Sequence, residues 1–211
     1  MRPFLPLCRQ VLLVMSSLAI GSFSCEGNEA PYEMLGIPCV PGDERQLDFA
    51  GHSNSEISIE TAAAVCGTGV CLVHHFQGRT TCPYGQTAAE ATSQTSKPES
   101  QLCHTPAGAT IDERVRVAVA PQLVGRRAAD VVHCSCRCAG ADPAASYCTC
   151  SKGFECRELI ERLPGVDDRD LAGSYCVRET DRFDVGTDGP ECTATNPELD
   201  SPGQCGPYVG K

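Results

Sequence analysis

The sequence predicts a small disulfide-rich fold that is mainly β, with one or two short helices and long loops. The prediction depends on 16 cysteines in 211 residues, an aromatic content of 5% without tryptophan, and short apolar segments separated by Pro- and Gly-containing stretches. So few large aromatic side chains leave little material for a hydrophobic core, and disulfides are the usual substitute in an oxidising compartment. The net charge of −10 argues against a nucleic-acid partner, because the phosphate backbone would repel the protein.

Residues 1–24 have the layout of a secretory signal peptide. Arg2 and Arg9 precede an apolar segment at residues 11–20, and small residues follow it. As a helix, the apolar segment would be about 15 Å long, roughly half the hydrocarbon core of a bilayer. We therefore expect an export signal rather than a membrane span.

The end of this segment resembles a bacterial lipoprotein signal, in which a lipid-modified cysteine becomes the first residue of the mature chain. Ser24 matches the small residue before that cysteine, whereas Ser22 stands where the family usually has an aliphatic residue. The resemblance implies a lipid on Cys25, a polar tether at residues 25–38 and attachment to a membrane of the bacterial cell envelope. Parity agrees, because 16 cysteines minus Cys8 and an acylated Cys25 leave an even set of 14. Ordinary cleavage and a secreted soluble protein form the alternative.

Residues 39–103 form the first predicted cysteine-rich region. Residues 58–65 are expected to form a short helix, and residues 70–76 a strand that returns through residues 79–84 as a hairpin. A polar linker follows at about residues 85–102, and residues 86–100 of it contain no large apolar side chain.

Residues 104–178 form the second region. Alternating valines predict a strand within residues 111–119, and a further strand is expected at residues 131–138. Residues 154–163 have apolar side chains at helical spacing before a Pro-Gly pair, which predicts a short helix.

The last part of the chain, residues 179–211, is an acidic Pro- and Gly-rich tail pinned by two cysteines. Its acids do not follow the order of a calcium-binding loop, so they are predicted to be solvated, as is the Arg126-Arg127 pair. The acids concerned are Asp181, Asp184, Asp188 and Glu191.

Fourteen cysteines are predicted to form about seven disulfides, with partners that the sequence leaves open. On a strand, Cys134, Cys136 and Cys138 share one face with parallel Cβ vectors, which prevents bonding to each other, so each should reach a different partner. The spacing Cys-x-x-Cys is absent, which argues against a thioredoxin-type motif and the common zinc ribbons. The predicted disulfide cysteines are Cys39, Cys66, Cys71, Cys82, Cys103, Cys134, Cys136, Cys138, Cys148, Cys150, Cys156, Cys176, Cys192 and Cys205.

Residues 148–156 resemble the C-terminal half of an epidermal-growth-factor-like module, where Cys-x-Cys-x-x-Gly-aromatic forms a tight hairpin. Cys156 arrives earlier than in that family. The resemblance implies a small disulfide-bonded hairpin of a kind that usually binds proteins or acts as a spacer.

No catalytic motif, metal site or cofactor site is predicted, which favours a non-enzymatic interaction or structural module with an unidentified protein partner. The alternative is an envelope enzyme or metal-binding protein, with a site built from histidines and carboxylates or from cysteine thiolates. Strand alternation places His74 and His75 on opposite faces, and places His133 opposite the neighbouring cysteines. A pocket that gathers these histidines with carboxylates would favour the alternative.

Overall fold

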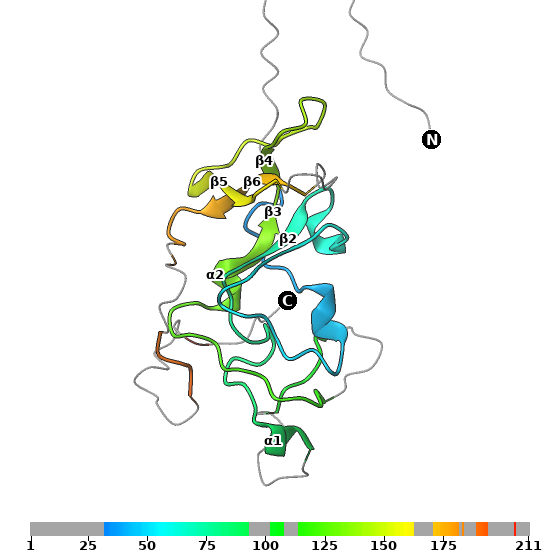
Figure 1. The fold of residues 1–211 in the computed structure, drawn as a ribbon, viewed down its shortest axis with the longest axis vertical. Helices are drawn as coiled ribbons and strands as arrows, with labels where there is room; N and C mark the ends of the chain where they lie inside the picture. Colours follow the sequence, from blue (N-terminus) through cyan, green and yellow to red (C-terminus); the bar gives the residue numbers. More distant parts are fainter. Residues whose placement is uncertain are drawn as a thin grey trace, which may run out of the picture.

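Two small antiparallel sheets and short helical segments, joined by long turns and loops, form the part of the chain described by a computed structural model. The described residues are 32–92, 102–107, 114–162, 171–181, 183, 189–193 and 205. In chain order the elements are η1 (Gly42–Arg45), β1 (Ile57–Glu60), η2 (Ala64–Cys66), β2 (Val70–His74), α1 (Ala88–Thr92), α2 (Ala128–Val131), β3 (Val132–Ser135), β4 (Arg137–Ala139), β5 (Phe154–Ile160) and β6 (Gly173–Arg178) (Figure 1). The predicted class, a small disulfide-rich and mainly β fold, is confirmed.

The two sheets have the strand orders β1-β2-β3 and β4-β6-β5. In the first sheet, Cys71 lies opposite Cys134, and in the second, Cys156 lies opposite Cys176. The chain passes from one sheet to the other at Cys136, between β3 and β4. The second sheet therefore lies at one end of the molecule, directly beyond β2 and β3 (Figure 1).

The two faces of the first sheet contact different surroundings. Cys71, Val73, Val132 and Cys134 face a core completed by Cys39, Cys66 and Phe76. The opposite face contacts the second sheet, where the Ser135 hydroxyl donates a hydrogen bond to the Cys176 carbonyl at 2.8 Å. On the same face, His133 lies edge-on to Phe154 with ring centroids 5.6 Å apart. The layer between the two sheets is therefore partly polar.

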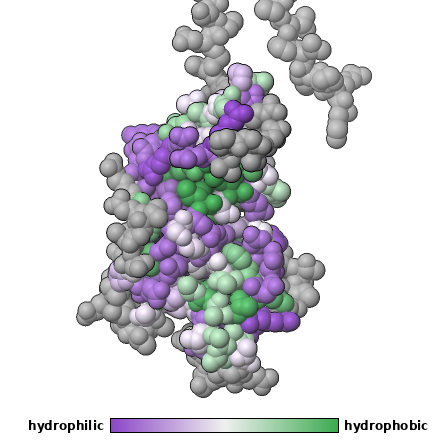
Figure 2. Space-filling view, viewed as in Figure 1, coloured by the Kyte–Doolittle hydropathy of each residue, from purple (hydrophilic) through white to green (hydrophobic). Residues whose placement is uncertain are grey.

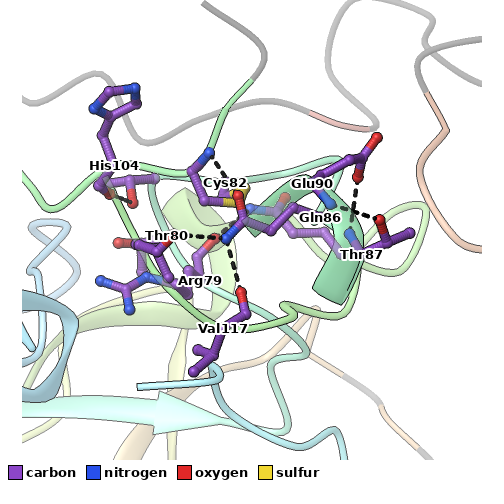
Figure 3. The surroundings of a disulfide bond; sticks show 12 residues. Arg79, Thr80, Cys82, Gln86, Thr87, Glu90, His104 and Val117 are labelled. Carbon is purple, nitrogen blue, oxygen red and sulfur yellow. Dashed lines mark hydrogen bonds between the residues drawn. A yellow bond between two sulfur atoms is a disulfide. The ribbon is translucent and has the colours of Figure 1, made fainter. Parts of the chain in front are cut away.

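A second small core surrounds the disulfide between Cys82 and Cys103, together with Val115. The buried side-chain amide of Gln86 donates to the carbonyls of Val115 at 3.0 Å and Val117 at 2.7 Å (Figure 3). Its carbonyl oxygen accepts from the backbone N–H of Cys103 at 3.2 Å. This side chain satisfies valine carbonyls that would otherwise need a neighbouring strand.

Seven disulfides join the fourteen cysteines after residue 25, which confirms the expected number. Cys134, Cys136 and Cys138 reach three different partners, as their strand spacing predicts. Cys66–Cys134 connects the first cysteine-rich region to the second, and Cys103 bonds to the N-terminal side of the predicted linker. The bonds are Cys39–Cys71, Cys66–Cys134, Cys82–Cys103, Cys136–Cys148, Cys138–Cys156, Cys150–Cys176 and Cys192–Cys205.

The helix predicted at residues 58–65 is wrong. Most of this range belongs to strand β1 and to the 3-10 turn η2. Its alanines favour a helix, but Ile57 and Ile59 pair opposite His74 and Leu72 of β2. Pairing with a neighbouring strand outweighs the local propensity.

The helix predicted at residues 154–163 is also wrong, because residues 154–160 form strand β5. Every second residue could equally face one side of a sheet, and Cys156 bonds to Cys138 in β4. Backbone pairing with β6 and this cross-link determine the extended conformation. Helical spacing in a segment this short does not distinguish helix from strand.

Three further elements differ from the expectation. Residues 79–84 do not return as a strand, because the Cys82 N–H closes a turn on the Arg79 carbonyl at 3.1 Å, and β2 pairs with β1 and β3 instead. The predicted strand at residues 111–119, described from residue 114, makes only isolated bridges. The predicted strand at residues 131–138 is divided between two sheets.

The start of the predicted linker contains helix α1. Thr87 caps it, since its hydroxyl accepts from the Glu90 N–H at 3.2 Å and the Glu90 carboxylate accepts from the Thr87 N–H at 2.8 Å. This is a capping box, and the Thr-x-x-Glu spacing was visible in the sequence.

The viewed surface is mostly polar, with separate apolar areas below the second sheet and in the lower half of the molecule (Figure 2). Among the described residues, no helix has the length and hydropathy needed to cross a bilayer. Seven disulfides are typical of proteins from an extracellular or otherwise oxidising compartment.

Candidate functional site

A groove lies between the start of β2, strand β4 and the segment before Cys148. Its volume is about 480 Å³, and its lining includes Tyr32, Tyr147, Tyr175 and Arg137. Arg137 is the one charged side chain among the described lining residues, although the chain as a whole carries a net charge of −10. The groove therefore combines aromatic surface with a positive charge.

Hydrogen bonds and burial hold the tyrosines of this groove in place. The Tyr147 hydroxyl donates to the Asp142 carbonyl at 2.7 Å, and the guanidinium of Arg137 lies 5.2 Å from the centroid of the Tyr147 ring. The Tyr175 hydroxyl donates to the Leu171 carbonyl at 2.7 Å. Burial raises the pKa of Tyr175 above its ordinary value, so its phenol stays neutral and remains a donor.

The wall of the groove contains the disulfide Cys136–Cys148. A second disulfide, Cys150–Cys176, lies directly behind it. The Cys176 sulfur is 3.7 Å from the Cys148 sulfur and 3.9 Å from the Cys136 sulfur. Two disulfides are thus nearly in contact at the groove.

A second candidate site is the buried polar layer between the sheets. His74 at the end of β2 donates from Nδ1 to Asp181 Oδ2 at 2.6 Å, and both side chains are only 2% exposed. Arg126 donates to the other Asp181 oxygen at 2.9 Å and to the His74 carbonyl at 2.8 Å. Burial raises the pKa of Asp181, but the hydrogen bonds and charges of His74 and Arg126 outweigh burial, and the net pKa is lowered.

These contacts correct two expectations about solvation. Asp181 was predicted to be a solvated acid of the tail and Arg126 a solvated base, whereas they form an ion pair in which Asp181 is buried. Fifty-five residues separate them, so no local pattern reveals the pair. The rings of His74 and His75 also lie closer together than strand alternation predicts, with centroids 4.6 Å apart. The reason is that the strand ends at His74 and His75 takes a φ of 50°.

His133 occupies the same layer. Its side chain is fully buried, and neither ring nitrogen makes a hydrogen bond of normal geometry with a described residue. Burial, followed by the charge of Arg178, lowers the pKa of His133 to about 4, and the charge of Asp181 and the nearby Cys176 carbonyl oppose this shift. The ring is therefore neutral at physiological pH.

The remaining predicted site residues are distributed as follows. All fourteen cysteines are in disulfides, and Cys25 with its predicted lipid lies outside the described residues, as do Asp184 and Asp188. Within the described residues, the groups of three side chains able to share a metal ion are three cysteine triplets, each already oxidised. His52 pairs with Glu56 at 3.0 Å.

The fold and these sites define a class, a small mainly β protein whose sheets are cross-linked by seven disulfides. No family profile, curated protein or solved structure matches the chain.

Proposed function

We propose that this protein is an exported, lipid-anchored module of a bacterial cell envelope that acts by binding a protein partner rather than by catalysis. The observation that carries the anchor is the pairing of the cysteines. Seven disulfides use all fourteen cysteines after residue 25, so Cys25 has no partner among them. Acylation gives this cysteine a role, whereas an unpaired thiol is usually avoided in an oxidising compartment.

The groove beside Arg137 supports the binding role. Tyrosine and arginine are the side chains that most often supply binding energy in protein interfaces. Tyr32, Tyr147 and Arg137 come from separate segments, and the disulfide Cys136–Cys148 fixes the segment between β4 and Cys148. A preorganised surface of this kind loses little conformational entropy on binding.

The enzymatic alternative is favoured by one observation, the pair formed by His74 and Asp181. A histidine that donates Nδ1–H to a carboxylate supplies two of the three members of a catalytic triad, without the nucleophile. Here both side chains are only 2% exposed, and Arg126 forms an ion pair with the second oxygen of the Asp181 carboxylate. A substrate could therefore not reach His74 without separation of the two sheets. The pair is better suited to joining the sheets than to catalysis.

Replacing Cys25 with serine tests the anchor. In a bacterial host that exports the full chain, we expect the wild type in the membrane fraction and Cys25→Ser in the soluble periplasmic or extracellular fraction. A lipid is the only attachment that the account provides, so the shift should be nearly complete. Immunoblotting of the fractions measures it.

Cys8→Ser is the matched control, because it removes another unpaired cysteine that the account assigns to the signal peptide. This variant should stay in the membrane fraction. A wild type found in the soluble fraction, or a Cys25→Ser variant that remains membrane-bound, would contradict the lipid anchor.

A further inference from the structure

We propose that the three disulfides of the second sheet form a thiol–disulfide exchange relay, which oxidises a dithiol polypeptide bound in the groove. The proposal rests on the partner-binding role of the groove but not on the lipid anchor. It concerns Cys136–Cys148 in the groove wall, Cys150–Cys176 behind it, and Cys138–Cys156 at β5.

Sulfur distances connect these bonds into one series. The Cys176 sulfur is 3.9 Å from the Cys136 sulfur, and the Cys150 sulfur lies within 4.8 Å of those of Cys138 and Cys156. Exchange proceeds by attack of a thiolate on a neighbouring disulfide sulfur, so adjacent disulfides can pass a thiolate along the series. Cys148 and Cys150 lie outside helices and strands, and the N–H of Cys148 donates to the Arg137 carbonyl at 3.0 Å, so exchange there requires rotation of the side chains.

Both ends of the series are accessible. The half-buried Cys148 lines the groove, and Cys156 on β5 is exposed, whereas Cys176 in the middle is fully buried. Arg137 also lines the groove, and a cation next to a thiol favours the reactive thiolate form. An incoming thiol would therefore meet a positive charge beside the first disulfide.

The reaction balances without a further oxidant. A substrate thiolate attacks the Cys148 sulfur, and Cys136 leaves as a thiolate. Cys136 then attacks Cys176 and releases Cys150, which attacks Cys138 and releases the exposed Cys156. The second substrate thiolate attacks the first substrate sulfur of the mixed disulfide, so Cys148 leaves as a thiolate and the substrate leaves as a disulfide.

The protein exchanges three disulfides for two, Cys136–Cys176 and Cys138–Cys150. It takes up the two electrons and two protons of the substrate dithiol as thiols at Cys148 and Cys156. Release of the last thiolate at Cys156 is favoured because solvent stabilises its charge.

The first sheet provides an internal comparison. Cys39, Cys66 and Cys134 also lie within 4.8 Å of one another and belong to two adjacent disulfides. All of these cysteines are at most 2% exposed, so an external thiol has no access. Proximity without exposure should leave this pair of disulfides inert.

The test treats the native full-length protein with one equivalent of a reduced synthetic peptide that carries two cysteines, followed by acid quenching and alkylation. Non-reducing peptide mapping by mass spectrometry then identifies each bond. We expect the oxidised peptide, alkyl groups on Cys148 and Cys156, and the new bonds Cys136–Cys176 and Cys138–Cys150. Wild-type protein is sufficient for this readout, so it does not depend on the folding of a variant.

Four variants sharpen the test. Replacing Cys150 and Cys176 together with serine should confine alkylation to Cys136 and Cys148. The matched pair Cys192→Ser with Cys205→Ser removes a disulfide outside the series and should leave the new bonds unchanged. Arg137→Gln should slow the reaction roughly tenfold at neutral pH, because loss of the cation should raise the pKa of the attacking thiol in the groove by about one unit. Arg137→Lys retains the positive charge and should restore most of the rate.

Three outcomes would overturn the relay: no oxidised peptide, alkylation of Cys136 and Cys148 alone in the wild type, or random reduction of all seven disulfides. Peptide binding in the groove with native cysteine pairing would overturn the relay and retain the binding role. Absence of both binding and exchange would contradict the role of the groove in the proposed function as well.

Discussion

Replacing Cys66 and Cys134 together with alanine should lower the free energy of unfolding by about 4 kcal/mol. The disulfide closes a loop with a sequence separation of 68, the longest of the seven. In the chain-entropy treatment, a loop of this length restricts the unfolded chain by roughly that amount. Both cysteines are also fully buried in the hydrophobic core, so their removal weakens packing as well. Equilibrium unfolding in urea measures the loss.

The matched control is Cys192→Ala with Cys205→Ala. This bond has a sequence separation of only 13, and its removal should cost about 3 kcal/mol at most. If stability depends chiefly on the long cross-link between the two regions, the free energy of unfolding should fall more when Cys66 and Cys134 are replaced. Equal losses, or a smaller loss for this pair, would contradict that role.

Replacing His133 with leucine should make the protein more resistant to acid. The pKa of His133 is about 4 in the folded protein and 6.5 in the unfolded chain. Between these values the unfolded chain binds a proton that the native state excludes, so stability decreases as the pH falls from 6.5 to 4. The full difference corresponds to about 3 kcal/mol, which the leucine variant should no longer lose.

Urea unfolding at several pH values between 7.5 and 4 measures this effect. His75, whose pKa is lowered mainly by burial, contributes in the same direction over this range, so the variant should retain part of the acid sensitivity. The lowered pKa of Asp181 acts below its ordinary value of 3.8, and the pKa of Glu44, which burial raises above 4.5, acts in the opposite direction. Phe154→Leu is the control, because it changes packing against the same ring without removing a titratable group. Parallel pH curves for wild type and His133→Leu would show that this ring does not carry the effect.

The periodicity of the cysteines predicted more of the fold than the apolar pattern did. Strand alternation correctly predicted three different disulfide partners for Cys134, Cys136 and Cys138. It did not show that the chain changes sheet at Cys136, because a strand that continues and one that crosses to another sheet have the same local spacing. The helix predicted around Cys156 failed for a related reason, since its strand conformation depends on a partner strand near Cys176.

The candidate sites were harder to predict than the fold. Asp181 and Arg126 look solvated in sequence because each lies among polar residues, and only the folded chain brings them together. The groove is assembled from segments around Tyr32, Arg137 and Tyr147, none of which forms a motif by itself. Contacts between distant segments decide both sites, and one sequence does not reveal them.

The most direct test of the account is the intact mass of the native protein, purified from the membrane fraction and alkylated without reductant. We expect a chain that begins at Cys25, carries acyl groups, contains seven disulfides and takes up no alkyl group. A chain without lipid that contains several alkylated cysteines would contradict both the anchor and the disulfide framework.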